Sequence, residues 1–492
     1  MKTQPLALTL ILILILSLPC ALPPVTAGEP PGLQAGTAVV DITPDVFPMQ
    51  LRSGPSSHVH DPLHVRAVAF QNGTGRAVIA VVDDIGVGRE WTGEAKARVA
   101  ERTGWDSGQM LVAATHTHSA PRGGDSSPGR IAYQTGRLEG LVEALSQAIE
   151  NLQPARVGFA SDVEPSEVYN RRWFLKEGTM DKNPLGGYDQ VRTNAPRQHL
   201  REPAGPTDPE VSVIDIRTRR GRALGLIANY ALHYVGGIPR VIEEDGRSVG
   251  MASADYFGEF ARIMPYRVGG SNPPEDFVAM MTNGASGDVN NIDFYSQRAP
   301  RAPFEQARIV AGKTADAAWR AVRQIETYHE NPEVAMLQRE VAIPYRRPSE
   351  EDVQQARQLM ELSPSERDRI HSRTTSVASN TLRYAESDMP ESEHVLLQAL
   401  RIGDQALVTM PFEVLVEIGL EIKQKSPFPR TFLISLANGS YGYLPPPHQH
   451  ELGGYETWLG TSRFAPNASV LLTEQLLEML AELHQPLSAS RP

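Results

Sequence analysis

The sequence predicts an α/β fold in which a mixed β-sheet core is flanked by helices. Short apolar runs, typical of buried strands, alternate along the chain with longer segments of helical periodicity. Glycine (40 residues) and proline (39 residues) are spread through the 492-residue chain, as in a loop-rich α/β protein. No internal repeat and no convincing domain boundary interrupts this pattern, so we expect one large domain.

The apolar pattern also places the individual elements. Strands are predicted at residues 38–42, 65–70, 77–82, 110–114, 212–216, 223–230, 277–281, 396–402, 406–409 and 431–436. Helices are predicted at residues 90–103, 136–151, 253–263, 304–327, 349–362, 412–425 and 468–484. Residues 236–250 and 344–390 are expected to be surface excursions, the second with a charge-rich, solvated helical subregion at 348–384.

The first 27 residues have the three parts of a secretory signal peptide. Lys2 supplies the positive charge, the run from Leu6 to Leu18 is apolar, and the small-residue cleavage site ends at Ala27. The apolar run is too short to cross a hydrocarbon core, which needs about 20 residues. We therefore expect residues 28–492 to be secreted or periplasmic as one large domain, with an uncleaved anchor as the alternative.

Composition narrows the classes of function. Hydrophobic residues make up 41% and charged residues 21% of the chain, which excludes a disordered chain and a polytopic membrane protein. The single cysteine, Cys20, excludes a disulfide framework and any cysteine-ligated zinc or iron–sulfur site. The formal net charge of −11 argues against a nucleic-acid partner, because binding a phosphate backbone needs a basic surface. No protein partner is indicated.

A His-Thr-His element follows the strand predicted at residues 110–114. Side chains at positions i and i+2 of a strand point to the same face, so His116 and His118 can present two imidazoles to one point. Imidazole is a common zinc ligand, and a catalytic zinc needs about three protein ligands and an open position. The alternative is a pair of histidines with ordinary hydrogen bonds at the end of a strand.

Other histidines are weaker candidates. The pairs His58/His60 and His448/His450 lie in loop-like segments, where solvated or locally bonded side chains are expected. His233 follows the apolar run 223–230, and by itself such a histidine is more often structural than a metal ligand.

Several segments, taken together, resemble one family, the neutral/alkaline non-lysosomal ceramidases. The matching segments, in the family's order, are residues 36–44, 115–121, 170–171, 229–233, 410–413, 438–443 and 455–456. They span nearly all of the chain after the leader. The resemblance implies a zinc amidase that cleaves the amide of ceramide, a lipid substrate that can be presented at a membrane surface, to sphingosine and a fatty acid.

The resemblance also implies the roles of individual residues. The Zn²⁺ ligands would be His116, His118, His233, Glu413 and Tyr443. Arg171 and Asn290 would position the substrate or stabilise an oxyanion, and Tyr455 would contact the reaction intermediate. The simpler alternatives are that Glu413 is an acidic residue in the first turn of the helix 412–425 and that Tyr443 and Tyr455 are ordinary loop aromatics.

The chain departs from the family pattern in two places. Asn290 stands where the family has a serine treated as catalytic, and Ser286 is only a weak substitute. The C-terminal immunoglobulin-like domain of typical members is also expected to be absent. Three hypotheses therefore stay open: a ceramidase, a zinc hydrolase acting on a different acyl amide or ester, and a non-catalytic binding protein that retains the fold.

Overall fold

A computed structural model describes residues 32–51, 54–121, 128–386 and 388–485 of the chain. The predicted leader, with Cys20, lies outside the described residues. None of the described helices combines the length and the hydropathy that a membrane span requires.

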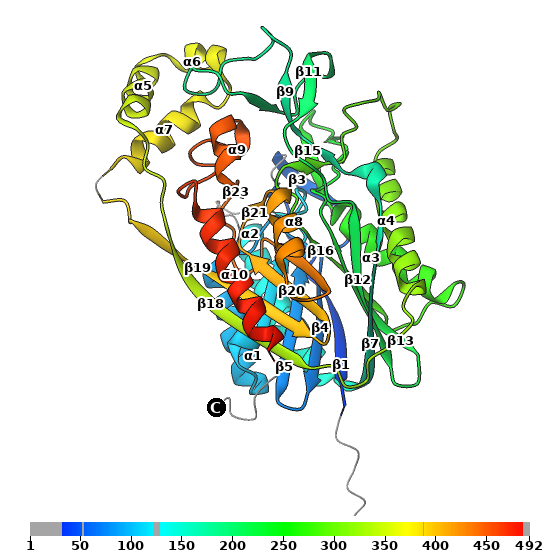
Figure 1. The fold of residues 1–492 in the computed structure, drawn as a ribbon. Coiled ribbons are helices and arrows are strands. Elements are labelled where there is room, and N and C mark those ends of the chain that lie inside the picture. Colours follow the sequence, from blue (N-terminus) through cyan, green and yellow to red (C-terminus); the bar gives the residue numbers. More distant parts are fainter. Residues whose placement is uncertain (1–31, 52–53, 122–127, 387, 486–492) are drawn as a thin grey trace, which may run out of the picture.

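The described elements form four layers, helices on sheet on sheet on helices (Figure 1). The larger sheet has the strand order β16 (Val278–Asn283), β13 (Ala223–Tyr230), β12 (Glu210–Thr218), β7 (Gln153–Val163), β1 (Gln34–Asp41), β4 (His64–Asn72), β5 (Gly75–Val82) and β6 (Met110–Ala114). The smaller sheet has the order β18 (Val334–Pro344), β19 (Ser392–Ile402), β20 (Gln405–Met410) and β22 (Arg430–Ser435). Both sheets mix parallel and antiparallel pairs, which confirms the predicted fold class.

Helices cover the outer faces of both sheets. The larger sheet is covered by α1 (Arg89–Thr103), α2 (Pro128–Glu150), α3 (Asp255–Gly269) and α4 (Glu305–Arg323). The smaller sheet is covered by α8 (Val416–Lys425) and α10 (Ala468–His484). Between the sheets, Phe70 and Leu111 of the larger sheet join the same buried cluster as Leu407 and Phe432 of the smaller one. Burial of this apolar surface holds the two sheets together.

Most of the short elements gather at the upper end of the molecule in Figure 1. The short strands are β2 (Met49–Leu51), β3 (Gly54–Val59), β8 (Tyr169–Asn170), β9 (Arg172–Leu175), β10 (Val191–Thr193), β11 (Leu200–Pro203), β14 (Val241–Ile242), β15 (Ser248–Ala252), β17 (Val289–Asn290), β21 (Glu413–Val414) and β23 (Tyr443–Leu444). The short helices are α5 (Glu350–Glu361), α6 (Pro364–Ile370), α7 (Thr374–Tyr384) and α9 (Pro447–Leu452), with single turns η1 (Ser107–Gln109), η2 (Pro165–Glu167), η3 (Arg197–His199) and η4 (Tyr455–Thr457).

The larger sheet curls so far that its two edge strands, β16 and β6, come into contact. The Asn283 side chain, at the end of β16, donates a hydrogen bond of 3.3 Å to the carbonyl of Thr115, just after β6. The loops that follow β6 and β13 therefore meet at one end of the sheet, although the two strands are far apart in the strand order.

Each predicted strand and helix is present; β6, β13 and α10 have the predicted bounds, and the others have shifted ends. The helix predicted at 412–425 begins only at Val416, and Glu413 lies on β21 instead of in the first turn. Two long strands, β7 and β18, were not predicted. Their exposed and buried residues are interspersed, so neither forms the continuous apolar run of a buried strand.

The subregion 348–384 is helical, as predicted, and its sequence explains where its helices start. Ser349 and Asp352 form a capping box at the start of α5, and Ser363 and Glu366 form a second one at the start of α6. Pro364 occupies the first turn of α6, where a missing N–H costs nothing.

A buried lysine, Lys96, packs against the loop that follows β22. Lys96 of α1 is 4% exposed, and its ammonium donates to Asn438 Oδ1 at 2.5 Å. Asn438 also accepts from the Val112 N–H and donates to Gln398 Oε1. Burial is the main reason why the pKa of Lys96 is lowered to about 7, with help from the charge of Arg89. The unfolded chain has the ordinary lysine pKa of about 10.4.

Lys96→Met is expected to change how stability depends on pH. Between pH 7 and 10 the unfolded chain binds more protons at Lys96 than the folded chain does, so wild-type stability rises with pH in this window. Relative to Lys96→Met, the wild type should gain on the order of 2 kcal/mol from pH 7 to pH 9. Chemical denaturation at both values measures this, with the exposed Lys176→Met as control. Parallel pH curves for Lys96→Met and the wild type would contradict the burial argument.

Candidate metal centre

His116 and His118 lie beyond the end of β6, in a turn. The strand ends at Ala114, and His116 has φ 75°, the left-handed region that side chains other than glycine rarely adopt. The two imidazoles meet as predicted, but the turn brings them together, not the alternation of a strand. Strained backbone of this kind persists where the surroundings over-determine it, often at functional sites.

His233 follows β13, in a loop whose backbone is held by a buried carboxylate. Asp255, at the start of α3, accepts hydrogen bonds from the N–H groups of Val235 (3.0 Å) and Gly236 (2.8 Å). Burial raises the pKa of Asp255 to about 6, against these hydrogen bonds. The side chain of Asp255 therefore fixes the backbone that directly follows His233.

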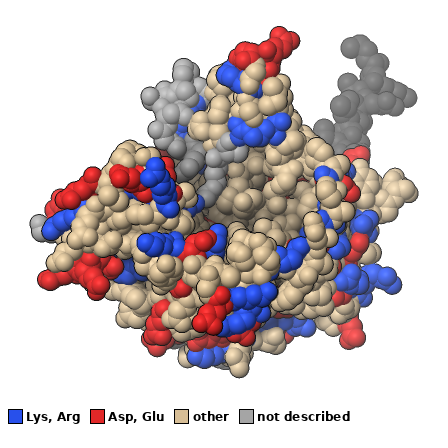
Figure 2. All heavy atoms as spheres, turned by 90° about the horizontal axis from the view of Figure 1, so that it is seen from above, with Lys and Arg blue, Asp and Glu red and all other residues tan. Residues whose placement is uncertain are grey.

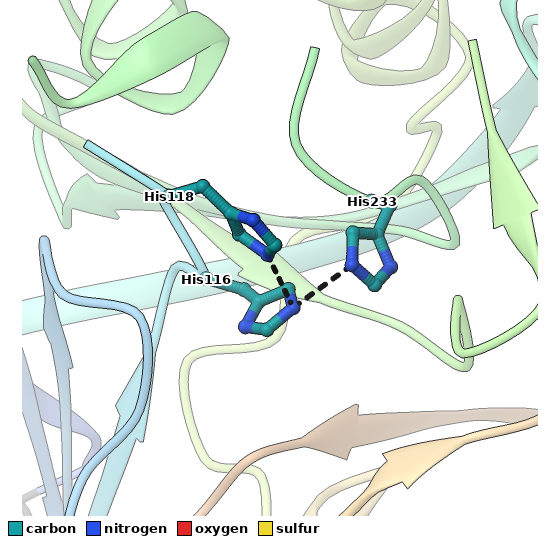
Figure 3. A group of neighbouring side chains, drawn as sticks. All are labelled: His116, His118 and His233. Carbon is teal, nitrogen blue, oxygen red and sulfur yellow. Dashed lines mark hydrogen bonds between the residues drawn. The ribbon is translucent and has the colours of Figure 1, made fainter. Parts of the chain in front are cut away.

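The three imidazoles converge on one point (Figure 3). His116 Nε2 lies 3.0 Å from His233 Nε2 and 3.1 Å from His118 Nε2, and one ligand atom from each ring lies within 4.8 Å of the others. The ring of His118 stacks on Tyr234, with centroids 3.6 Å apart. The structure thus brings together the three histidines that were predicted as ligands.

The Nδ1 hydrogen atoms of His116 and His233 point away from the point of convergence. His116 Nδ1 is 2.6 Å from the carbonyl of Ile85, and His233 Nδ1 is 3.1 Å from the carbonyl of Ser286. Carbonyls only accept, so both Nδ1 atoms carry hydrogen, and burial lowers the pKa of His233 well below 6.5. If one Nε2 atom carried a hydrogen, that hydrogen could satisfy one contact between two Nε2 atoms. The other contacts at this point would still be between lone pairs. A cation satisfies all of them.

Glu413 adds a carboxylate to the cluster. Its Oε2 atom lies 3.4 Å from His116 Nε2 and 3.7 Å from His233 Nε2, and this buried oxygen accepts no hydrogen bond from the described residues. Burial opposes its ionisation, but the two imidazoles and the Tyr443 hydroxyl lower the pKa of Glu413 to about 2. An ionised, orphaned carboxylate oxygen beside converging imidazoles fits a divalent cation such as zinc.

Tyr443 is placed beside Glu413 by strand pairing. Glu413 of β21 and Tyr443 of β23 are direct partners in a parallel pair. The Arg171 guanidinium donates to the Tyr443 hydroxyl at 3.0 Å. Burial and the Glu413 carboxylate raise the pKa of Tyr443 well above 10, and Arg171 opposes this shift. Tyr443 is therefore held beside Glu413, and its role as a metal ligand stays a prediction.

Arg171 is anchored by a buried acid, Glu456, which lies in the matching segment 455–456 but was assigned no role from the sequence. Glu456 accepts from Arg171 Nε at 2.9 Å and from Arg172 at 2.7 Å, and both the Glu456 and Arg172 side chains are fully buried. Thr193 donates a third hydrogen bond to Glu456, at 2.6 Å. Two adjacent arginines in a chain of net negative charge were the available signal, but their partner is distant in sequence.

The segment around Gly287 joins these parts. The Gly287 carbonyl accepts from Arg171 at 2.6 Å, and its N–H donates to the carbonyl of Val414. A Cβ at Gly287 would lie 2.7 Å from the carbonyl oxygen of Glu413, so only glycine allows this approach. Together with the contact between Ser286 and His233, this segment connects a histidine, the arginine and the carboxylate strand.

Asn290 and Ser286 point elsewhere. The Asn290 amide donates to Asn194 at 2.7 Å, and its oxygen accepts from the N–H of Ile292 at 2.9 Å. The Ser286 hydroxyl donates to Asn283. Neither Asn290 nor Ser286 is among the described residues that line the cavity at the centre. Direct participation of Asn290 in chemistry stays a prediction, and Asn194 is the residue that connects it to the cavity.

A cavity of about 350 Å³ opens beside the centre. The described residues that line it are His118, Arg171, Met180, Asp181, Lys182, Asp189, Val191, Arg192, Thr193, Asn194, His233, Tyr234, His371, Arg373, Tyr443, Gly454, Tyr455 and Trp458. Tyr455 therefore lines the cavity, with its ring 5.5 Å from that of Tyr443, and its contact with a reaction intermediate stays a prediction. Figure 2, a view from above, shows this face hollowed, with charged side chains around the hollow.

The remaining histidine pairs make local contacts, as expected. His58 lies 4.0 Å from Glu243, and His60 stacks on Phe304. His448 lies 2.6 Å from Glu417. Burial and the charge of Arg346 lower the pKa of His450 to about 3.

Comparisons with known proteins give a fold and no family. No protein-family model matches the chain, and no curated protein matches it. The structure is similar to the crystal structure of neutral ceramidase from Pseudomonas aeruginosa, with a TM-score of 0.68 and 16% identity over 94% of this chain and 76% of that one. It is also similar to a structure of ceramidase complexed with C2, with a TM-score of 0.67 and 16% identity over 94% of this chain and 77% of that one. At this identity the likeness shows that the chain has a ceramidase-like fold.

Proposed function

We propose that this chain is an exported, zinc-dependent amidohydrolase that cleaves the acyl amide of ceramide or a related lipid. The observation that carries the proposal is the cluster of His116, His118 and His233 around the orphaned carboxylate oxygen of Glu413. The ceramidase-like fold supports the same class of reaction. The predicted signal peptide at residues 1–27 supports export, and we propose residues 28–492 as a single catalytic domain.

In this proposal the three histidines and Glu413 hold the zinc ion, with Tyr443 beside them. When bound there, zinc supplies Lewis acidity toward the amide carbonyl and toward water, whose pKa it can lower to about 7. The two Nδ1–H···carbonyl contacts keep the His116 and His233 rings oriented with Nε2 toward the ion.

Tyr443 and Arg171 are suited to stabilise negative charge on the substrate oxygen. Arg171 donates to the Tyr443 hydroxyl and also lines the cavity, so its guanidinium can present donors to an oxyanion. Tyr443 can do the same once its single O–H turns from Glu413 to the substrate. Glu456 keeps the guanidinium in place, so these donors are oriented before the substrate arrives. Tyr455 offers a ring face or edge to the substrate next to this site.

Metal content is the first test. His233→Ala should lose bound zinc, with an affinity loss at least as large as the ~10–100-fold loss typical of removing an outer partner of a metal ligand. Elemental analysis of purified, dialysed protein measures this. His394→Ala, an exposed histidine on β19, is the matched control and should keep its zinc. If both variants bind equal amounts of zinc, or if the wild type binds none, the proposed zinc centre is wrong.

Turnover is the second test. Hydrolysis of a fluorescent ceramide should stop with a chelator and return with zinc. In zinc-saturated protein, Tyr443→Phe should lower kcat about 10²–10³-fold, as removal of one oxyanion donor does. Asn290→Ala should cost about tenfold or less, because it removes hydrogen bonds worth about 1 kcal/mol each outside the cavity. If His116→Ala hydrolyses the amide as fast as the wild type, the proposed function is wrong.

A further inference from the structure

The charged side chains at the rim of the cavity are not balanced. Among the described residues that line the cavity, apart from Arg171, which pairs with Glu456, five are charged: Lys182, Arg192, Arg373, Asp181 and Asp189. Positive groups are in excess here, in a chain whose formal net charge is −11. Such an excess in a concave site raises the local concentration of anions.

The two carboxylates of the rim are already engaged. Asp181 pairs with Arg192. Asp189 accepts hydrogen bonds from Trp458 Nε1 at 2.8 Å and from Asn183 at 3.0 Å. Among the described residues, no carboxylate forms an ion pair with Arg373 or with its neighbour at the rim, Lys182.

Of the positive groups at the rim, Arg373 is the one that lies on a ring beside the metal centre. It follows α6 and precedes α7, and its guanidinium lies 4.6 Å from the centroid of the Tyr455 ring. The Tyr455 ring lies 5.5 Å from the Tyr443 ring, and Tyr443 adjoins the metal centre. A guanidinium resting on a ring keeps its N–H groups available at the edge, where a carboxylate can bind two of them.

The positive charges at the rim also affect the pKa of His371. It lines the cavity two residues before Arg373, and its ring lies 5.1 Å from that of Trp458. Burial is the largest cause that lowers the pKa of His371, and the charges of Arg373 and Arg192 lower it further. The more remote carboxylates Asp181 and Asp189 act in the opposite direction without reversing the shift.

We propose that this cavity selects acyl amides that carry a carboxylate close to the scissile bond, as N-acyl amino acids do, with Arg373 as the residue that binds the carboxylate. Ceramide offers hydroxyl groups and two alkyl chains, and no charge that Arg373 could pair with. The inference rests on the proposed function for the bond that is cleaved, but the anion site can be measured without any turnover.

The kinetic test compares N-decanoylglycine with its uncharged amide, N-decanoylglycinamide, and with a ceramide. The wild type should prefer the carboxylate over its amide by roughly 10–100-fold in kcat/KM, the range expected for hydrogen bonds to a charged group. Arg373→Gln should reduce this preference to about threefold or less, since its amide cannot replace the charge. Arg369→Gln removes an equal charge from an exposed position on α6 that does not line the cavity, and should keep the preference.

The binding test uses N-decylsulfonylglycine and its glycinamide, which have no scissile carbonyl, with calorimetry on the full-length protein. A metal-bound carboxylate would strengthen binding of the carboxylate probe alone, but equally in both variants, so the comparison of Arg373→Gln with the wild type isolates the guanidinium. The carboxylate probe should bind the wild type at least tenfold more tightly than the amide probe, and Arg373→Gln should lose this difference.

The outcomes separate the two proposals. Hydrolysis of ceramide and of the amide without preference for the carboxylate, and equal binding of both probes, would overturn the anion site and leave the hydrolase proposal standing. Selective binding of the carboxylate probe without hydrolysis of any substrate would support the anion site and overturn the hydrolase. Selectivity that survives in Arg373→Gln would overturn the role of Arg373.

Discussion

Lone pairs of three imidazoles and a carboxylate face one another at the end of the curled sheet, and the rest of the site depends on how the fold maintains that approach. His116 and His233 lie on loops that follow strands from opposite parts of the larger sheet. Contact between its edge strands closes the gap, and the Asn283 side chain joins them. Without a cation these lone pairs repel one another, so many surrounding hydrogen bonds are needed to keep the side chains in place.

The side chains of the centre are held in place mostly by backbone carbonyls and by one buried cluster of ion pairs. Carbonyls of Ile85 and Ser286 orient two rings, and Glu456 holds Arg171 against the Tyr443 hydroxyl. Removing one partner from a buried ion pair typically costs about 3–5 kcal/mol, because the other charge is left without compensation. Glu456 therefore contributes to the stability of the fold and to the orientation of the donors at the same time.

The sequence predicts the parts of this protein that depend on local pattern. Buried strands such as β6 are continuous apolar runs, and His116, His118 and His233 meet as the resemblance implies. The φ of 75° at His116 was beyond prediction, because it comes from tertiary contacts and not from the residue type. The role of Arg373 was missed for a similar reason. It lies in a segment expected to be a solvated excursion, and only the folded chain brings that segment to the cavity.

The buried hydrogen bonds of Asn438 have a consequence for producing the protein. Asn438-Gly-Ser fits the acceptor rule for N-glycosylation. In the folded chain the Asn438 side chain is 1% exposed, and its amide nitrogen donates to Gln398 at 2.7 Å. A glycan attached during translocation into a eukaryotic secretory pathway would occupy that nitrogen before folding and keep the loop after β22 from docking on β6. A host that does not glycosylate, or a substitution of Ser440, avoids this competition between modification and folding.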